Sequence, residues 1–541
     1  MENKNVLMAL VLMLAVWTGY SMFFAKPAPQ ENGQNLETVA DNKSSVSSLN
    51  DIVAEKSPVS ERVLAADNNK ILPLDIVVET EDFRAVFTNI GARLKNLELK
   101  HYKQTMDSGS ALVSLVDAQS ETNTFDTFGT GDISIPADHL YAVDISDANF
   151  VVGSGEKKQL RFYSVLNKDL IIEKTYYFKG NGYDLELEVN LYNKGKDSKK
   201  GNLAFMLVQP WDDDREISRY SFVGPALYKD GEVVTHKIKS IIESPVKYSE
   251  KFEWTAFEEK YFMIAAVPLD GNRYSLTIDK TNTSIRNTID SESIKIDPDN
   301  SYNQKFMLYC GPRDLDILKS INYNLDKAIN FGFFDMLARP LLSFLKFFYN
   351  NIIQNYGVAI ILLTVFIKIL FWPLTHKSYK SMRDMQRLQP EMQRLREKFK
   401  KDKEKLNREI MELYRKNRVN PMGGCLPMFA QIPVFFALYK VLLESIALRH
   451  EPFIFWIQDL SAKDPYYITP VIMGVTMFIQ QKMSPTSMDS QQAKIMLFMP
   501  VIFTFMFLNF PSGLVIYWLV NNVLTILQQW TINRGASATI A

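Results

Sequence analysis

Apolar residues are concentrated in one early stretch of the chain and in five late ones. The early stretch, Val6–Phe24, runs for 19 residues without a charge. At about 1.5 Å per helical residue, it is long enough to cross a hydrocarbon core of about 30 Å. The late stretches are Tyr356–Leu374, Leu426–Leu448, Pro465–Lys482, Ala493–Phe510 and Leu514–Trp530. The pattern predicts six transmembrane helices, the last two forming a tight hairpin at Pro511-Ser512-Gly513.

The first span is either an uncleaved anchor or a cleaved signal peptide. A signal peptide has a shorter apolar region and small residues before its cleavage site, whereas Phe23 stands where a small residue is expected before Ala25. We therefore interpret residues 1–25 as an N-terminal transmembrane anchor. Residues 26–70 are polar and lack periodicity, which predicts a flexible tether.

Between residues 71 and 312 the pattern changes to short strands. After the turn Gly180-Asn181-Gly182, apolar and polar residues alternate through Leu185–Leu191, and Ile172–Phe178 supplies the other arm of a hairpin. Asp75–Thr80 and Asn96–Lys100 show the same strand-like pattern. The region is predicted to be a β-sandwich or a pair of packed sheets.

Residues 313–355 return to helical spacing and are predicted to be a helical linker. Apolar residues recur every three to four positions, with two basic residues interleaved; they are Phe334, Leu337, Leu341, Leu342, Leu345 and Phe348. Such a stripe before a span predicts an interfacial helix on the outer leaflet. Packing against the β region is the alternative. Residues 356–541 are then predicted to form a five-helix core.

Charge is distributed unevenly, although the net charge is zero with 61 basic and 61 acidic residues. Residues 26–340 carry a balance of −11, whereas the chain from Leu341 onward carries +11. The segment His376–Asn420 has 15 Lys/Arg and seven Asp/Glu, which marks a cytoplasmic loop. Alternation then places both termini in the cytoplasm and residues 26–355 outside. Cys310 and Cys425 fall on opposite sides and cannot pair, and the low cysteine content excludes a disulfide framework.

The basic loop is predicted to be a cytoplasmic helical hairpin over residues 376–420. Its apolar residues are spaced by three and four, first in Met382, Met385, Leu388, Met392, Leu395 and Phe399, then in Leu406, Ile410 and Leu413. Pro390 is expected to bend or interrupt the first helix. The positive charge of the hairpin indicates either a solvated topology signal or a docking surface for ribosomal RNA or lipid head groups.

Lys368 is the most informative residue, because it lies inside a predicted span. A cation at that depth costs about 2.5–3.5 kcal/mol on insertion scales and generally faces a bundle interior or a wet cavity. Snorkelling to the interface is the alternative. Thr364 lies one turn earlier on the same face, and in the last span Tyr517, Asn521, Thr525 and Gln528 recur along one face beside Trp518.

In the third span, Gln431 and Phe435 share a face, and Lys440 and Glu444 are spaced to pair. Interhelical hydrogen bonding explains some of these polar groups. No acidic partner for Lys368 is evident, so we expect a hydrated cavity open to the cytoplasm and lined by the second, third and last spans.

Little in the sequence points to catalysis. The histidines are scattered, no metal-ligand spacing or titratable cluster is found in residues 71–312, and there is no GxxxxGK[ST] nucleotide loop. A secondary transporter would also use an intramembrane charge, but it predicts inverted repeats and broken helices in both halves. A membrane-anchored sugar-binding or sugar-modifying protein is a third possibility.

Several stretches resemble one known family. They are NPMGGCLPMFAQIPVFFALYKVL (420–442), DLSAKDPYYITPVIMGVTMF (459–478), QKMSP (481–485) and FMPVIFTFMF with FPSGLVIYW (498–518). Over essentially its whole length, the chain resembles the YidC membrane-protein insertases of the longer, Gram-negative type. The resemblance implies a non-enzymatic protein of the bacterial inner membrane that needs no cofactor or metal and inserts and folds other membrane proteins, alone or with the Sec translocon.

The resemblance also implies partners and sites. The partners would be nascent membrane proteins, membrane lipids, and the ribosome or signal recognition particle, but no DNA. Lys368 falls where many members carry an arginine in a substrate-binding groove, and Thr364, Phe435, Tyr517 and Trp518 fall at substrate-contacting positions. The loop Ser484–Gln492 and the tail match ribosome-facing or signal-particle-facing elements, although Thr531–Ala541 carries only Arg534. The exported region resembles the family's twisted β-supersandwich, which is akin to sugar-binding folds.

Overall fold

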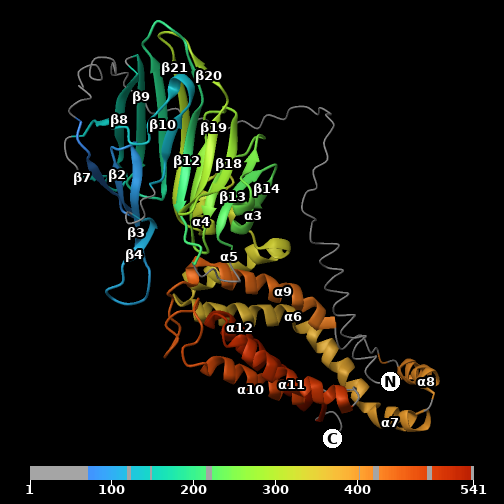
Figure 1. Ribbon diagram of the computed structural model, residues 1–541. Coiled ribbons are helices and arrows are strands. Elements are labelled where there is room, and N and C mark those ends of the chain that lie inside the picture. The colour runs from blue at the N-terminus through green and yellow to red at the C-terminus, as the bar shows by residue number, and fades with distance from the viewer. Residues whose placement is uncertain are drawn as a thin grey trace. The chain divides into compact units, whose positions relative to one another are not determined.

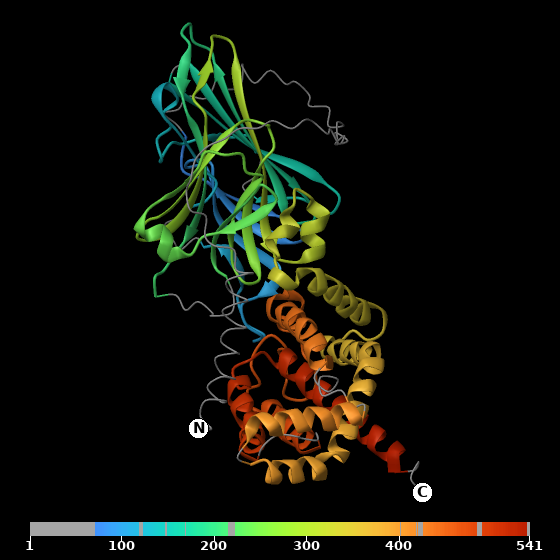
Figure 2. The same ribbon diagram turned by 90° about the vertical axis from the view of Figure 1, so that its right-hand side faces the viewer.

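The computed structural model (Figures 1 and 2) describes residues 71–117, 123–145, 149–167, 169–214, 222–400, 402–417, 419, 426–483 and 490–537. The predicted anchor at Val6–Phe24, the tether at 26–70 and Cys425 lie outside these residues. So do most of the loop Ser484–Gln492 and the end of the tail.

Most strands of the β region belong to three sheets, in which neighbouring strands are antiparallel except for one parallel pair at the edge of the first sheet. In spatial order, the first five-stranded sheet contains β4 (Leu112–Val116), β3 (Arg93–Lys103), β2 (Phe83–Thr88), β1 (Asp75–Glu79) and β7 (Asn149–Val151). The second contains β15 (Val246–Tyr248), β18 (Tyr274–Lys280), β19 (Ser284–Ser291), β12 (Leu203–Pro210) and β5 (Asp126–Gly129). The short strands β11 (Lys199–Gly201) and β20 (Ile294–Ile296) pair separately.

A nine-stranded sheet is the largest sheet of the described β region. Its order is β14 (Glu232–Thr235), β13 (Gly224–Lys229), β16 (Trp254–Glu258), β17 (Phe262–Pro268), β21 (Ser301–Pro312), β10 (Asp184–Asn193), β9 (Leu170–Lys179), β8 (Lys157–Asn167) and β6 (Ala142–Val143). The predicted hairpin is confirmed as β9 and β10, with Leu185 opposite Phe178. Gly182 in its turn has φ +94°, a conformation that glycine adopts without strain.

Aromatic contacts join the sheets into a sandwich. Tyr176 of β9 lies 4.7 Å from Phe87 of β2, between ring centroids, and Phe306 of β21 stacks 4.5 Å from Phe205 of β12. Leu187 of β10 pairs with both Tyr176 and Phe306, so these side chains lie on one face of the large sheet. Both five-stranded sheets therefore pack on that face, as the prediction of packed sheets requires.

The helices follow the β region along the chain (Figure 1). Besides the short α3 (Ile238–Glu243), they are α4 (Leu315–Ile321), α5 (Asp335–Asn351), α6 (Tyr356–Arg387), α7 (Gln389–Lys398), α8 (Lys403–Lys416), α9 (Leu426–Glu444), α10 (Ile468–Met483), α11 (Ser490–Phe507) and α12 (Ser512–Ser537). Within the described residues, α6 is the helix that is both long and apolar enough to cross a membrane. The helices α9 to α12 coincide with the other late apolar stretches.

The helix that contains Lys368 extends beyond the predicted end of its span at Leu374. It continues to Arg387, and a new helix, α7, begins at Gln389 with Pro390 in its first turn. Proline lacks the N–H that a continuous helix needs and its ring clashes with the preceding turn, but it is tolerated in the first turn of a new helix, so the break occurs where the sequence predicted it. Helices α7 and α8 pack through Leu388, Met392 and Tyr414, and form the helical hairpin.

The helix α5 has two apolar sides. Ala338, Leu342 and Leu345 are buried, whereas Met336 and Phe347 are exposed. At its ends, Arg339 pairs with Asp326 and Asp335, and Lys346 pairs with Asp314 and Asp316. One side of the helix therefore packs mainly on α6 and α9, whereas the alternative interpretation expected packing against the β region, and its other side leaves apolar residues exposed.

Candidate functional site

Lys368 reaches from α6 to the last helix. Its Nζ atom donates a hydrogen bond to Thr525 Oγ1 of α12 at 2.7 Å. Among the described residues, no carboxylate lies within ion-pair distance of this ammonium. Its partner is a neutral hydroxyl, so its positive charge is not cancelled by an adjacent negative one.

The hydroxyl of Thr525 continues a chain of hydrogen bonds through α12 to α9. It donates to the main-chain oxygen of Asn521 at 2.6 Å. The side-chain oxygen of Asn521 in turn accepts a hydrogen bond of 2.9 Å from Gln431 Nε2. Three helices are thus joined by polar groups, which explains why the polar stripes of α9 and α12 face each other.

Aromatic side chains lie beside this polar chain. The ring of Phe435 in α9 lies 4.8 Å from that of Trp518 and 6.4 Å from that of Tyr517. The indole N–H of Trp518 is buried and has no hydrogen-bond partner in the described part of the chain. A buried donor of this kind is suited to an acceptor brought by another molecule.

The structure places six of the seven predicted site residues in two connected groups. Hydrogen bonds join Lys368, Asn521 and Gln431 through Thr525, and ring contacts join Phe435, Tyr517 and Trp518. Thr364 is buried on α6, but its hydroxyl donates to Ile360 O of the same helix at 2.7 Å. Thr364 therefore lines the same helix face without joining the hydrogen-bonded chain.

Two further polar contacts lie between these helices. Gln528 Nε2 of α12 donates to Thr375 Oγ1 of α6 at 2.6 Å, and Asn522 Nδ2 reaches Thr476 Oγ1 of α10 at 3.4 Å. Sequence analysis missed Thr375 and Thr476, because a single threonine gives no signal of its partner on another helix. The predicted Lys440–Glu444 pair is confirmed, at 3.0 Å.

The β region contains a fully buried lysine. Lys174 of β9 donates from Nζ to the carbonyl oxygens of Gly91 and Phe125, each at 3.1 Å. Burial lowers the pKa of Lys174 to about 7, and Asp126 opposes this effect while Arg93 adds to it. Sequence alternation places residue 174 on the core face, but the sequence does not show which carbonyl groups compensate its amine.

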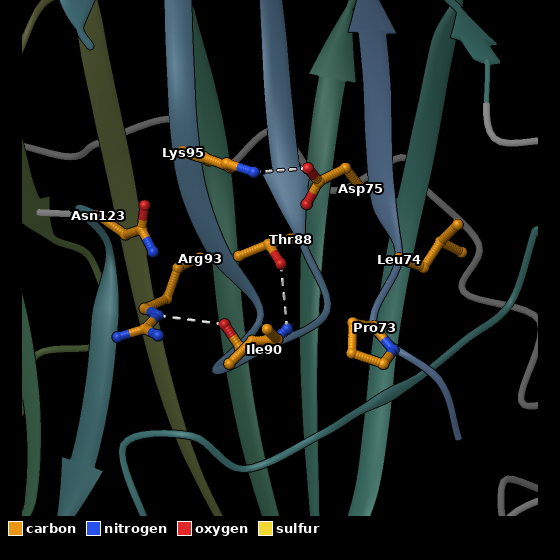
Figure 3. Close-up of a pocket in the computed structure, with 8 residues that line it drawn as sticks. All are labelled: Pro73, Leu74, Asp75, Thr88, Ile90, Arg93, Lys95 and Asn123. Carbon is orange, nitrogen blue, oxygen red and sulfur yellow. Dashed lines mark hydrogen bonds and ion pairs between the residues drawn. The ribbon is translucent and has the colours of Figure 1, made fainter. Parts of the chain in front are cut away.

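A pocket of about 350 Å³ opens at the start of β1 (Figure 3). Its lining residues are Pro73, Leu74, Asp75, Thr88, Ile90, Arg93, Lys95 and Asn123. Both cations have carboxylate partners, since Lys95 pairs with Asp75 at 2.7 Å and Arg93 with Asp126 at 3.1 Å. The pocket thus has little uncompensated charge for a ligand. No group of three or more His, Cys, Asp or Glu side chains suited to a metal occurs in the described residues.

Comparisons with known proteins agree with this architecture. Residues 75–344 match the family described as YidC periplasmic domain, and residues 347–539 match the family described as 60Kd inner membrane protein. The chain is 44% identical over 540 residues to the membrane protein insertase YidC of Geobacter sulfurreducens, covering 100% of both chains. It is 44% identical over 543 residues to that of Geotalea uraniireducens, covering 98% of this chain and 99% of the relative.

Among solved structures, a crystal structure of an active YidC insertase with its first transmembrane domain resolved is 17% identical. It covers 86% of this chain and 96% of its own, with a TM-score of 0.35.

The two family matches define an inner-membrane protein with a helical core and a large periplasmic β domain. The chain belongs to the YidC family of membrane protein insertases. It is accordingly an insertase and not an enzyme.

Proposed function

We propose that the protein inserts and folds inner-membrane proteins through a hydrophilic groove open to the cytoplasm. Lys368 supplies the positive charge of this groove, which is lined by α6, α9 and α12. The observation that carries the proposal is the hydrogen bond of Lys368 to Thr525, within a chain of polar groups that joins the three helices. A charge held by a neutral hydroxyl remains able to attract an acidic or polar segment of a substrate.

In this mechanism, an arriving hairpin enters from the cytoplasm and its polar segment meets Lys368. Thr364, Phe435, Tyr517 and Trp518 contact the substrate, and the unpaired indole N–H of Trp518 donates to a substrate carbonyl. Water in the groove and a locally thinned bilayer lower the cost of holding polar groups partway across.

The apolar segment of the substrate then leaves along the lipid-facing sides of α6 and α12. Ile369 and Leu370 on α6, and Val523 and Leu527 on α12, are exposed apolar side chains that suit such a path. Burial of the substrate span in lipid provides the driving force for release, because each buried CH₂ contributes about 0.8 kcal/mol. No nucleotide is needed in this scheme.

We further propose that the chain crosses the membrane six times, with both termini in the cytoplasm and residues 26–355 in the periplasm. The charge balance supports this arrangement, since 15 of the basic residues lie in the segment His376–Asn420. Cooperation with the Sec translocon is proposed from family membership. The basic hairpin supports contact with the ribosome, the signal recognition particle or anionic lipid.

Site-specific photocrosslinking during synthesis of a small membrane protein tests the groove. A photoreactive amino acid at Thr364 or Trp518 is expected to give adducts with the nascent chain. Phe505 on α11 is the control, because it is an apolar side chain that is 67% exposed on a helix outside the groove and the exit path. Adducts with lipid at Phe505 and none with the nascent chain at Thr364 and Trp518 would refute the groove.

A further inference from the structure

The loop between α9 and α10, residues 445–467, has an apolar and exposed tip. Residues 452–458 of this loop have the sequence PFIFWIQ, which contains no charged side chain. Within this stretch, Phe455 is 78% exposed and Ile454 is 48% exposed. Turns that face water are normally built from Gly, Pro, Asn, Asp and Ser. The tip of this loop is therefore suited to an apolar environment and not to water.

Main-chain hydrogen bonds close the tip into a tight turn at residues 453–457, which we call the aromatic turn. Ile457 N donates to Ile454 O at 3.1 Å, and Phe453 N donates to Ile457 O at 2.9 Å. Phe455 has φ +53°, a left-handed conformation that is rare for a bulky residue and persists only where the surrounding structure enforces it. The aromatic turn therefore presents Phe455 from a defined backbone geometry.

The aromatic turn is attached to the start of α6. Asn355 caps this helix by accepting a hydrogen bond from Val358 N at 3.0 Å, and its Nδ2 atom donates to Phe453 O at 3.2 Å. The ring of Phe453 packs directly on the helix backbone, because a Cβ atom added at Gly357 would overlap this ring. The position of the aromatic turn is therefore linked to the position of α6.

A second attachment joins the same loop to α12. Gly513 N, in the first turn of α12, donates to Leu460 O at 2.9 Å. Leu460 and Ile457 are buried, whereas Ile454 and Phe455 are exposed. One part of the loop thus packs within the protein, on helices that we propose to line the groove, and the tip of the aromatic turn is left exposed.

A lipid surface is the partner that fits this tip. The helices α9 and α10 coincide with two of the late apolar stretches, and they lie in the part of the chain that matches an inner-membrane protein family. Aromatic side chains are enriched where membrane helices meet the head groups, and apolar side chains there insert into the acyl boundary. Exposed apolar residues continue along one side of α10, at Ile468, Val471, Ile472 and Val475. The loop therefore meets the bilayer beside residues that suit contact with lipid.

We propose that the aromatic turn inserts Ile454 and Phe455 into the phospholipid of the outer leaflet and thereby fixes the depth of α6 in the membrane. Lys368 follows 12 residues after Tyr356, the first residue of α6, which is about 18 Å along the helix axis. The turn thus sets the depth at which the proposed groove holds its charge. The choice of the outer leaflet rests on the proposed topology, whereas insertion of the turn into lipid does not.

Spin-label depth measurements on the full chain in nanodiscs of phosphatidylethanolamine and phosphatidylglycerol test the insertion. In a background with Cys310→Ala and Cys425→Ser, a nitroxide is attached at Ile454→Cys or at Asp107→Cys in the β domain. Oxygen concentrates in hydrocarbon and a nickel chelate stays in water, so the ratio of their collision rates with the nitroxide reports depth. We expect this ratio to be at least about fivefold higher at position 454 than at position 107. Nanodiscs admit both probes from either side, so a wrong topology would leave this result unchanged.

Phe455→Asn tests the control of depth, because asparagine accepts a left-handed φ and the replacement removes the apolar ring without adding backbone strain. The nitroxide is now attached at Leu370→Cys on α6, where the native side chain is 67% exposed. We expect Phe455→Asn to change the ratio at position 370 at least about twofold. Leu72→Asn ahead of β1 is the matched control, because Leu72 has the same exposed fraction of 78%, and it is expected to leave the ratio unchanged.

Three results would overturn the proposal. A ratio at position 454 as low as that at position 107 would place the turn in water. Low collision rates of both probes at position 454 would mean that protein, such as a second copy of this chain, covers the turn. An unchanged ratio at position 370 in a folded Phe455→Asn variant would show that the turn does not set the depth of α6. If Phe455→Asn does not fold, the measurement at position 454 still decides, because Ile454→Cys retains the ring of Phe455.

Discussion

Lys368 carries a compact charge where many relatives are expected to carry a guanidinium, and its geometry fits that difference. A lysine donates from a single atom, and here Nζ meets the single hydroxyl of Thr525 at 2.7 Å. An arginine would present a planar fork of donors that one hydroxyl cannot satisfy. Our mechanism therefore depends on the charge at position 368 and not on bidentate hydrogen bonding.

Replacing Lys368 tests this dependence. We expect Lys368→Arg to support insertion of a substrate with an acidic exported segment, and Lys368→Glu to reduce it at least about tenfold. Unit charges about 8 Å apart at an effective dielectric constant of about 20 attract by roughly 2 kcal/mol, and the replacement turns this into repulsion. Insertion is measured in proteoliposomes as protease protection of the substrate.

The control is Lys440→Gln, which removes a cation from α9 that already pairs with Glu444 at 3.0 Å. We expect Lys440→Gln to insert substrates normally. If Lys368→Glu then inserts acidic substrates as well as the unmodified protein does, the attraction argument is contradicted.

Lys174 predicts a pH dependence of the stability of the β domain. Its pKa is about 7 in the folded state and near the ordinary value of 10.5 in the unfolded state. Between these values the unfolded state binds more protons, so stability should rise with pH in that window by up to about 1.4 kcal/mol per unit. Below pH 7 both states are protonated and this contribution becomes constant.

The measurement compares the full chain with Lys174→Met by hydrogen exchange of β9 at several pH values. We expect the variant to lose the contribution of Lys174 to the slope of stability against pH. The difference between the two slopes isolates this contribution, because the other titrating groups are the same in both proteins. Its absolute stability is a separate matter, because the carbonyls of Gly91 and Phe125 lose their donor. Identical slopes for the two proteins would show that Lys174 does not change protonation on folding.

Single residues were predictable from the sequence, but their partners were not. Lys368 stood out because a cation interrupts an apolar span. Its pairing with Thr525 was not predictable, because it depends on how α6 and α12 are rotated toward each other. The attachment of the aromatic turn to α6 gave no signal at all, because Asn355 and Phe453 are 98 residues apart in the chain and no local pattern joins them.

Among the elements, boundaries set by local chemistry were predicted best. The break before α7 follows from Pro390, and α11 ends at Phe507 and α12 begins at Ser512, so the connection between them overlaps the predicted turn at Pro511. The extension of α6 to Arg387 was not predicted. The change from apolar to basic residues marks where a span ends in the membrane, but nothing there interrupts a helix.

Close packing between α10 and α11 depends on a small residue. A Cβ atom added at Gly474 would lie 2.0 Å from Thr504 Oγ1, closer than real Cβ contacts allow. Small residues of this kind let helix backbones approach each other in membranes. We expect Gly474→Ala to destabilise the helical core by about 1–3 kcal/mol, measured by thermal unfolding in nanodiscs.

A second replacement on the facing helix makes this prediction specific. Thr504→Ala removes the atom in conflict, so the double variant Gly474→Ala/Thr504→Ala should recover most of the stability that Gly474→Ala loses. Additive losses in the double variant would show that the contact between α10 and α11 is not the cause.

At the scale of the whole molecule, the two regions differ in how much their sequences reveal. The β9–β10 hairpin is local, and alternation with a glycine turn identifies it. The pairing of β10 with β21, and of β5 with β12, joins segments far apart in the chain, and no periodic pattern selects such partners. The existence of a sandwich was therefore predictable, whereas its strand order was not.

The uneven distribution of charge leads to the final prediction, which concerns topology. In a background with Cys310→Ala and Cys425→Ser, a single cysteine is placed at Asp107 in the β domain or at Glu404 in the helical hairpin. Both native side chains are exposed, so a labelling reagent can reach either position. If the basic hairpin is cytoplasmic, a membrane-impermeant maleimide added to intact spheroplasts labels position 107 and leaves position 404 unlabelled.

Permeabilising the membrane should then allow labelling at position 404 without changing that at position 107. A cysteine at 404 that reacts in intact spheroplasts would place the hairpin outside. It would also separate Lys368 from a cytoplasmic entrance, because α6 runs continuously from the lysine toward the hairpin. The topology experiment thus tests the direction from which a substrate enters, independently of whether Lys368 attracts it.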